Sequence, residues 1–331
     1  MNQPSYLMIS TNPGSVSLLK EEMKRNYPHL HPSFTSGQLV TFKSSAGPIP
    51  ANFKLNAIFA RTFAFLLFKS DEQNLQKNIA QWLESKQMKK VFFDCWPAKD
   101  GLGQFLPLIS EWPAEVTLSV VKTGENEYWV GERPTYLTNG PYTWQSHQEY
   151  EQLALPEESP SRSYLKMAQG FYWAKLKLST GDRVLEIGSA PGGMTYFFLQ
   201  GHCRITGVDT GEMAPVCLKN PLFRQIPLSL HKVKTENLPR EIDWLVIDVN
   251  LDPKLIFPEW RELLTHYRSR LKGCLVNLKL VEGAKQKIPQ YLKEVGKMGW
   301  NEWKAVQLPA HGQEFLIIGL SETCSRVDTG L

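Results

Sequence analysis

Short apolar strands alternate regularly with helices between residues 161 and 320, and this alternation constrains the fold more than any other feature. The pattern predicts strands at 183–188, 204–209, 244–249 and 274–280 and helices at 161–178, 193–200, 257–271 and 284–298. Such alternation indicates a parallel, doubly wound α/β sheet. Two further strands are expected at 301–309 and 313–320, with only a short connection between them. Because a parallel crossover needs about a dozen residues, the last strand is expected to run antiparallel to its neighbour.

Polar side chains are expected to converge on one edge of this sheet. Gly188, Asp209, Asp248 and Lys279 lie at or near the carboxyl ends of predicted parallel strands. Glu314 opens the antiparallel strand, so it is expected at the same edge. Open α/β sheets bind ligands beyond the carboxyl ends of their strands. The sequence therefore predicts a functional site at this edge.

The residues before 144 predict a separate α/β region. Strands are expected at 5–11, 38–44 and 89–96, helices at 15–26, 55–68 and 74–87, and a hairpin that pairs 114–123 with 128–134. We expect an N-terminal α/β subdomain at 1–70, a second subdomain at 71–143, and a linker rich in Pro, Gly and polar residues at 144–160. The domain of alternating strands and helices then occupies 161–320, and a tail occupies 321–331.

The segment Gly188-Ser-Ala-Pro-Gly192-Gly193 follows a predicted strand and opens a predicted helix. Glycines at such a turn let the backbone approach a ligand closely, and Asp209 is placed to accept hydrogen bonds from ribose hydroxyls. The spacing differs from G-x-G-x-x-G and includes a proline, so a dinucleotide pyrophosphate is a poor fit. S-adenosylmethionine, a nucleoside cofactor without phosphates, fits better. The alternative is an ordinary strand-to-helix turn that uses glycine for its backbone alone.

Four charged residues at the predicted edge have ordinary explanations when each is taken alone. Lys279 lies in a strand of a sheet whose faces are normally covered, yet a lysine can reach solvent from a strand end. Asp248 ends an apolar strand, where aspartate often caps a helix or a turn. Lys166 lies on the first helix and Glu314 at a strand start, where solvated side chains are common. Their convergence on one edge favours a shared chemical role.

The motifs of this region resemble, in order, those of the FtsJ-type ribose 2′-O-methyltransferases. The segments that carry the resemblance lie within residues 161–320 and are SRSYLKM, VLEIGSAPGGMTY, ITGVDTGEMAP, WLVIDV, VNLKL and QEFLIIG. Within that family the chain is most similar to the RlmM-like bacterial large-subunit (23S) rRNA 2′-O-ribose methyltransferases, whose N-terminal region contains a THUMP domain. PGSVSLLKEEM, AIFARTFAF and the expected hairpin resemble that region more loosely.

The resemblance implies a Rossmann-like, class I S-adenosylmethionine-dependent methyltransferase domain with a mostly parallel seven-stranded sheet and an antiparallel last strand. It also implies an N-terminal ferredoxin-like or THUMP-like α/β region that binds RNA, with the THUMP-like RNA-binding subdomain at 71–143. The family's catalytic tetrad would fall on Lys166, Asp248, Lys279 and Glu314. Its cofactor contacts would fall on Gly188, Ser189, Ala190, Pro191, Gly192, Gly193, Met194, Asp209, Thr235 and Asp248. Met194 replaces an aromatic residue of many relatives, and the adenine-contacting acid has no clear match, with Thr235 or Glu236 as candidates.

The chemistry of ribose methylation gives these charged residues a role. A ribose 2′-hydroxyl is a weak nucleophile and must lose its proton as it attacks the sulfonium methyl in line. A lysine with a lowered pKa can accept that proton or stabilise the developing alkoxide, and we assign this role to Lys279. Lys166 would keep the pKa of Lys279 low by repulsion, and Asp248 and Glu314 would orient the amines.

Composition narrows the class of protein only in part. The formal net charge of +4 over 331 residues shows no bulk basic excess of the kind that nucleic-acid binders usually carry. Five separated cysteines without a C-x-x-C pair indicate neither a disulfide framework nor a zinc site, and no metal is expected. The start lacks the segments of a signal peptide, and no apolar stretch is long enough to cross a bilayer. We therefore expect a cytoplasmic protein without a membrane partner.

Two interpretations of the function stay open. The first is methylation of a ribose 2′-hydroxyl in RNA, where the resemblance implies a cytidine of 23S rRNA or of a large-subunit precursor, with another RNA as the alternative. The second is a non-catalytic RNA-binding or ribosome-assembly factor that has kept the fold. The sequence does not indicate an oligomeric state.

Overall fold

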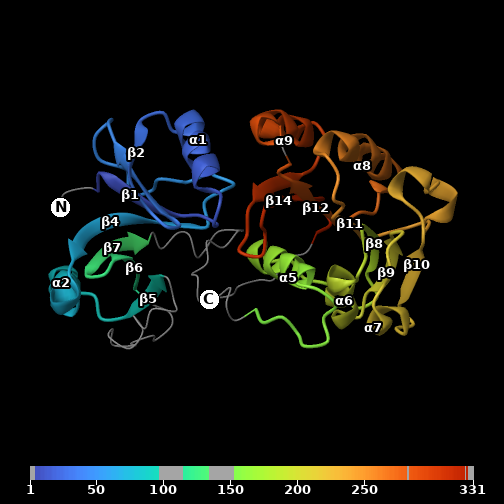
Figure 1. Cartoon of the computed structure of the whole chain (residues 1–331), viewed down its shortest axis with the longest axis horizontal. Coiled ribbons are helices and arrows are strands. Elements are labelled where there is room, and N and C mark those ends of the chain that lie inside the picture. Colours follow the sequence, from blue (N-terminus) through green and yellow to red (C-terminus); the bar gives the residue numbers. More distant parts are fainter. Residues whose placement is uncertain (1–3, 97–114, 134–152, 282, 325, 327–331) are drawn as a thin grey trace. The chain divides into compact units, whose positions relative to one another are not determined.

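The computed structural model describes residues 4–96, 115–133, 153–281, 283–324 and 326 (Figure 1). The chain divides into two compact units, Met1–Gln152 and Leu153–Leu331. This division falls within the expected linker 144–160. Part of that linker and part of the expected tail 321–331 lie outside the described residues.

The first unit contains, among its described residues, a seven-stranded sheet in the order β2-β3-β1-β4-β7-β6-β5. The strands are β1 (Tyr6–Ser10), β2 (Leu30–Ser36), β3 (Leu39–Ser44), β4 (Thr62–Ser70), β5 (Val91–Trp96), β6 (Val116–Gly124) and β7 (Glu127–Arg133). The described helices are α1 (Val16–Asn26) and α2 (Glu72–Lys86). The expected hairpin is confirmed, because β6 and β7 pair antiparallel and Gly124 faces Glu127 at the turn.

The expected helix at 55–68 is wrong. Thr62–Ser70 form β4, which pairs antiparallel with β1 on one side and with β7 on the other. Phe63, Ala64 and Phe65 are all buried, so the strand is covered on both faces and shows no alternation of polar and apolar residues. A continuous apolar run of this kind cannot be distinguished from a buried helix by periodicity. As a result, β4 places the expected subdomains 1–70 and 71–143 in one sheet.

The sequence also failed to predict β2, an edge strand of the first unit. Its sequence, LHPSFTS, buries only Leu30, and the register shifts between Pro32 and Phe34. An exposed edge strand that contains proline carries almost no hydrophobic signal, and proline is tolerated there because an edge strand leaves backbone groups unpaired.

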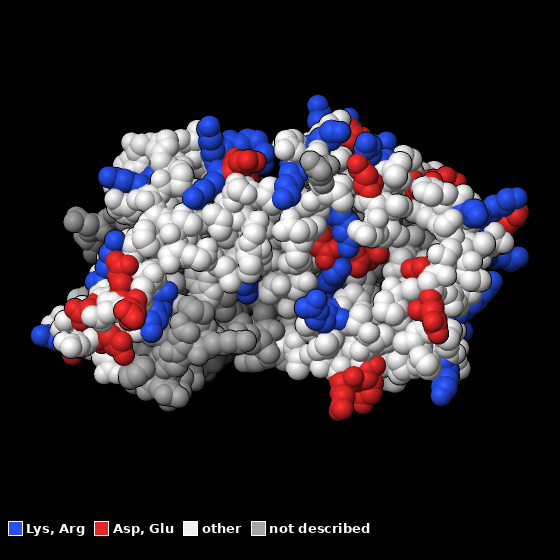
Figure 2. All heavy atoms as spheres, in the orientation of Figure 1, with Lys and Arg blue, Asp and Glu red and all other residues white. Residues whose placement is uncertain are grey.

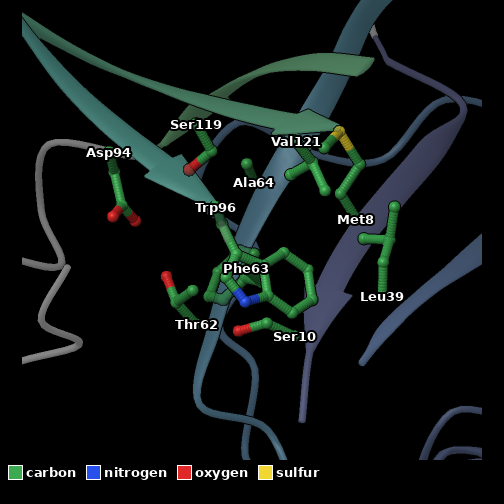
Figure 3. A pocket seen from close by; sticks show the side chains of 10 residues that line it. All are labelled: Met8, Ser10, Leu39, Thr62, Phe63, Ala64, Asp94, Trp96, Ser119 and Val121. Atoms are coloured by element: carbon green, nitrogen blue, oxygen red, sulfur yellow. The ribbon is translucent and has the colours of Figure 1, made fainter. Parts of the chain in front are cut away.

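A small pocket of the first unit lies among β1, β3, β4, β5 and β6 (Figure 3). The hydroxyls of Ser10, Thr62 and Ser119 line it and have no hydrogen-bond partner in the described part of the chain. The Asp94 carboxylate also lines it and lies 3.7 Å from a guanidinium nitrogen of Arg133. The other lining side chains are apolar, so the pocket is a gap in the packing of the sheet rather than a charged cleft.

A buried carboxylate ties α1 to the segment before β4. Glu22, which is 4% exposed, accepts hydrogen bonds from the backbone amides of Ile58 at 2.9 Å and Phe59 at 3.2 Å. Burial raises the pKa of Glu22 to about 7, against the lowering effects of these two bonds and of Arg25. The contact between α1 and this segment is therefore sensitive to pH.

We expect the stability of the first unit to fall as the pH rises from 4.5 towards about 7. The folded state holds the Glu22 proton more tightly than the unfolded chain does, so this contribution is complete below the unfolded pKa and is lost as the pH rises through the folded one. Glu22→Gln should be less stable at low pH but should lack this pH dependence. Hydrogen exchange of the Ile58 and Phe59 amides, corrected for intrinsic rates, measures it. An unchanged pH dependence in Glu22→Gln would contradict the interpretation.

The second unit contains, among its described residues, a seven-stranded sheet in the order β10-β9-β8-β11-β12-β14-β13 (Figure 1). The strands are β8 (Arg183–Ile187), β9 (Arg204–Val208), β10 (Phe223–Ile226), β11 (Trp244–Ile247), β12 (Gly273–Lys279), β13 (Glu302–Val306) and β14 (Glu314–Leu320). The described α-helices are α5 (Ser163–Trp173), α6 (Gly193–Gln200), α7 (Pro215–Leu218), α8 (Pro253–Tyr267) and α9 (Ile288–Gly296). The short 3-10 helices are η3 (Leu230–Lys232), η4 (Thr235–Asn237) and η5 (Lys285–Lys287).

The predicted topology of the second unit is confirmed. From β10 to β12 neighbouring strands pair in parallel, and β14 pairs antiparallel with both β12 and β13. In Figure 1, α8 and α9 cover one face of this sheet, and α5 and α6 cover the other. This is a Rossmann-like, doubly wound α/β fold, and its core includes the fully buried Trp244, Trp260 and Phe198.

In the second unit one expected helix needs correction and one strand was not predicted. The helix expected at 161–178 ends at Trp173, because Lys175 adopts a left-handed φ of 53° and Leu176 then forms an isolated β-bridge with Arg326. The sequence also failed to predict β10, whose four residues carry too short a pattern to read. Neither correction moves a strand end at the predicted site.

Charge and hydropathy patterns give little further guidance to function. Figure 2 shows acidic and basic side chains intermixed on the visible face of the second unit, without a large patch of one sign. Among the described residues, no helix has both the length and the apolar character needed to span a membrane.

Candidate active site

The structure brings together all four charged residues of the predicted tetrad, Lys166, Asp248, Lys279 and Glu314. Lys166 lies on α5, and Asp248 follows the last residue of β11. Lys279 ends β12 and Glu314 begins β14, and the antiparallel register places these two residues directly opposite each other. The prediction that strand ends would gather Asp248, Lys279 and Glu314 on one edge of the sheet is therefore confirmed in geometry, and α5 adds Lys166.

The tetrad forms a closed ring in which ammonium and carboxylate groups alternate. The Lys166 Nζ lies 2.9 Å from Asp248 Oδ2 and 2.6 Å from Glu314 Oε1. The Lys279 Nζ lies 2.8 Å from Asp248 Oδ1 and also contacts Glu314 Oε2. The four side chains are between 8% and 17% exposed. Each carboxylate thus holds both amines, and the ring has no formal net charge.

The pairing reverses the expected effect on Lys279. Burial lowers the pKa of Lys279, but the charges of Asp248 and Glu314 outweigh it, and the net pKa is raised above the ordinary value. The expectation that repulsion from Lys166 would keep this pKa low is wrong for this state of the protein. Lys166 contacts the carboxylates rather than facing Lys279 alone, so the two cations are separated by two anions.

Glu314 shows the complementary shift. Burial raises its pKa, but Lys166, His311 and Lys279 together outweigh burial, and the pKa of Glu314 lies below its ordinary value. At neutral pH the carboxylate is therefore ionised. A fixed, ionised carboxylate between two amines can hold both of them in one orientation, which is the role expected for an orienting group.

The glycines of the loop between β8 and α6 allow close contacts within the protein. Gly188 has a φ of +86°, and a Cβ there would lie 2.3 Å from the Asp248 carbonyl oxygen. A Cβ on Gly193 would lie 2.3 Å from Ser161 Oγ, next to the start of α5. The loop thus packs directly against the segments that carry Asp248 and Lys166. That these glycines admit a ligand stays a prediction; their close contacts with the segments of Asp248 and Lys166 give them a packing role.

Asp209 holds the same loop from the end of β9. Its Oδ2 accepts a hydrogen bond from the Ala190 amide at 3.0 Å, and its Oδ1 accepts one from the Gly211 amide at 2.7 Å. A carboxylate oxygen has two lone pairs, so each can still accept from a ribose hydroxyl. The Ser189 hydroxyl is buried in the loop and has no partner among the described residues. The acceptor capacity of Asp209 suits a polar nucleoside ligand, whereas the Ser189 side chain packs against Gly207 of β9.

The other predicted cofactor residues lie in different environments. Pro191 is exposed on the loop, whereas Met194 is 2% exposed and packs inside the start of α6. Thr235 begins the 3-10 helix η4 and is exposed, as is Glu236. Their contacts with adenine stay predictions.

Sequence reasoning missed a buried acid at this end of the sheet. Glu186 lies in β8, two residues before Gly188, and its Oε2 accepts a hydrogen bond from Thr195 Oγ1 at 2.6 Å. Burial raises the pKa of Glu186 to about 8, and the nearby Asp248 and Asp209 raise it further, against the lowering effect of Thr195. Its signal was present in RVLEI, because the acidic residue stands among apolar neighbours, between Leu185 and Ile187.

The described residues contain no group of three or more His, Cys, Asp or Glu side chains placed to hold a metal ion. The arrangement at the sheet edge instead offers paired amines and carboxylates beside a glycine loop.

Comparison with known proteins shows what the second unit is similar to. Residues 160–304 match the sequence model of the family described as FtsJ-like methyltransferase. This part of the second unit is thus similar to the FtsJ-like methyltransferases. This confirms the resemblance that the motifs indicated, and methyltransferases of this fold use S-adenosylmethionine. The loop Gly188–Gly193 and Asp209 fit that cofactor.

Curated relatives match only part of the chain. The chain is 31% identical over 110 residues to the ribosomal RNA large subunit methyltransferase M of Xylella fastidiosa (strain 9a5c), and this match covers 31% of the chain and 30% of that protein. It is 30% identical over 155 residues to the protein of the same name from Colwellia psychrerythraea, covering 43% and 40%. The matches thus span less than half the length of these relatives.

Likeness to a solved structure is weaker. The fibrillarin of Aeropyrum pernix, solved with natively bound S-adenosyl-L-methionine, is 17% identical with a TM-score of 0.38. The alignment covers 61% of this chain and 81% of that one. A likeness at this level does not bear on the function of the chain.

Proposed function

We propose that this protein transfers a methyl group from S-adenosylmethionine to a ribose 2′-hydroxyl of large-subunit ribosomal RNA. The observation that carries the proposal is the closed ring of Lys166, Asp248, Lys279 and Glu314 on the edge where the FtsJ-like domain would bind its cofactor. A ring of this kind can hold an amine beside a hydroxyl. The name shared by the two relatives supports ribosomal RNA as the substrate.

We assign to Lys279 the role of activating the reacting ribose hydroxyl. When bound, the cofactor supplies an activated methyl on a sulfonium. Lys279 would take the hydroxyl proton or donate a hydrogen bond to the alkoxide that develops. In the free protein the raised pKa of Lys279 keeps its amine protonated. The pKa of Lys279 would be lowered by repulsion from a further cation, the sulfonium of the bound cofactor. The base form of Lys279 would therefore be favoured only once the cofactor is bound.

The remaining members of the ring act as orienting groups. Asp248 contacts both amines and lies against Gly188, so it links the glycine loop to the lysines. Glu314 contacts both amines from β14, and Lys166 balances the charge of the two carboxylates. Loop residues Gly188–Gly193 and Asp209 would hold the cofactor. The first unit would bind the RNA, with a cytidine of 23S rRNA or of its precursor as the target.

A rival proposal is an RNA-binding or assembly factor without activity. Such a protein has no physical need for two lysines and two carboxylates packed in one buried ring, because desolvating ions is costly. The ring therefore favours the enzyme, although another RNA stays open as the substrate.

The test is incubation of the purified chain with labelled S-adenosylmethionine and total rRNA from cells that lack its gene. We expect label in large-subunit rRNA. A variant with Lys279 replaced serves as the inactive control. Binding of rRNA without incorporation of label into any RNA would support the rival factor and contradict the proposal.

A further inference from the structure

The turn between β13 and β14 contains a buried histidine that the tetrad does not include. His311 is 3% exposed. Its Nδ1 accepts a hydrogen bond from the Leu308 amide at 3.0 Å, and its Nε2 lies 3.0 Å from Asn277 Oδ1. Because Nδ1 accepts a backbone N–H, the ring proton is assigned to Nε2, which donates to the Asn277 oxygen. The ring therefore joins its own turn to a neighbouring strand.

That neighbouring strand carries Lys279. Asn277 lies in β12, two residues before Lys279, so both side chains lie on the same face of the sheet. Asn277 is completely buried. On the other side of the contact, Glu314 follows His311 by only three residues and begins β14. The bond between His311 and Asn277 thus connects the turn that precedes one member of the tetrad with the strand that ends in another.

Two buried glutamines hold the same turn. Gln169 Oε1 accepts a hydrogen bond from the Ala310 amide at 2.7 Å, and Gln169 lies three residues after Lys166 on α5. Gln307 Nε2 donates to the carbonyl oxygens of Gly312 at 2.9 Å and Glu314 at 3.1 Å. The turn is therefore fixed from α5 and from β12, which carry Lys166 and Lys279, and by a glutamine at its own start.

His311 makes these contacts as a neutral ring. Burial lowers its pKa to about 4; Glu314 and Asp248 oppose this shift, and Lys166 adds to it. Lys166 on α5 and Glu314 on β14 are thus charged groups that act on His311. A neutral ring with one donor and one acceptor can make both observed bonds, whereas a charged ring would lose the bond from the Leu308 amide.

We propose that His311 is a positioning residue for methyl transfer, which acts through its bond to Asn277 to hold the Glu314 carboxylate in place against Lys279. Glu314 contacts both lysines, so a small displacement of the turn loosens two ion pairs of the ring at once. The inference rests on the proposed function. In a purely structural role, by contrast, His311 would act mainly through the hydrogen bond that its Nδ1 accepts from the Leu308 amide within the turn.

Two substitutions separate these two bonds. In His311→Asn, the amide oxygen can replace Nδ1 and keep the bond from Leu308, but nothing reaches Asn277. In His311→Gln, the longer amide can donate to Asn277 as Nε2 does, and the bond within the turn is lost. We expect kcat to fall about 30- to 100-fold in His311→Asn and about threefold in His311→Gln, with KM and cofactor affinity little changed in both. His266→Gln, at an exposed position on α8, is the matched control.

The comparison of the two variants decides the inference. Equal losses in kcat, or a larger loss in His311→Gln, would overturn it, provided that both variants are folded by thermal unfolding. A wild-type protein without methyl transfer would instead refute the proposed function. A readout independent of activity is the ¹⁵N spectrum of the histidine rings in the unloaded wild type. We expect His311 to show the neutral Nε2–H form from about pH 6 to about pH 9, and a protonated or Nδ1–H ring would overturn the assignment.

Discussion

Lys279→Ala is expected to lower the rate of methyl transfer by about 10³-fold or more while cofactor binding survives. The Lys279 amine lies between Asp248 and Glu314, and its removal takes away the group assigned to the ribose hydroxyl. The cofactor residues of the glycine loop and Asp209 are left in place. Single-turnover methyl transfer and equilibrium cofactor binding, measured on the same preparation, give the two quantities.

The control for this variant is Lys177→Ala, which removes an exposed lysine shortly after α5. It should keep full activity. Loss of Lys279 also leaves two buried carboxylates with Lys166 alone, so thermal unfolding has to show that the variant is folded at the assay temperature. Turnover retained within tenfold of the wild type would sink the assignment of Lys279.

Gly188→Ala is expected to destabilise the second unit by about 3 to 5 kcal/mol and to weaken cofactor binding strongly. A Cβ at this position would lie 2.3 Å from the Asp248 carbonyl oxygen and 2.8 Å from its carbonyl carbon. Both are backbone atoms, so the end of β8 and the end of β11 would have to separate. That movement displaces the glycine loop from the tetrad.

The same unit offers a matched control for Gly188→Ala. Gly181 has the same φ of +86°, but a Cβ there would meet nothing within 4 Å. Gly181→Ala should therefore cost only the backbone strain of a left-handed alanine, about 1 to 2 kcal/mol, and leave cofactor affinity intact. Chemical denaturation and equilibrium binding compare the two. Equal losses of stability would show that the contact with Asp248 is not what requires glycine at 188.

The sequence predicted the site because the fold class determines where strand ends meet. Once β8, β11 and β12 were read as parallel strands and β14 as antiparallel, Asp248, Lys279 and Glu314 had to share an edge. The short connection before β14 was enough to set its direction. Periodicity failed where it carries no information: β4 contains an unbroken apolar run from Phe63 to Phe68, and β2 is mostly polar and exposed.

The electrostatics of the site could not be predicted in the same way. The charge state of Lys279 depends on which oxygen atoms its amine reaches, and those oxygens come from β11 and β14. The sequence predicts that Lys166 lies near Lys279 and repels it. In the structure the carboxylates of Asp248 and Glu314 lie between the two amines. His311 and Asn277 were missed for a related reason, since a single buried hydrogen bond leaves no pattern in the sequence.

The central claim is that the ring of Lys166, Asp248, Lys279 and Glu314 promotes methylation of a ribose oxygen rather than of a base. The most direct measurement is complete digestion of the labelled rRNA to nucleosides, followed by chromatography and mass spectrometry. The account predicts that the label is found in a 2′-O-methylated nucleoside and that this product is absent with Lys279→Ala. Label found on a base, or a 2′-O-methylated product that Lys279→Ala forms at a rate within about tenfold of the wild type, would contradict it.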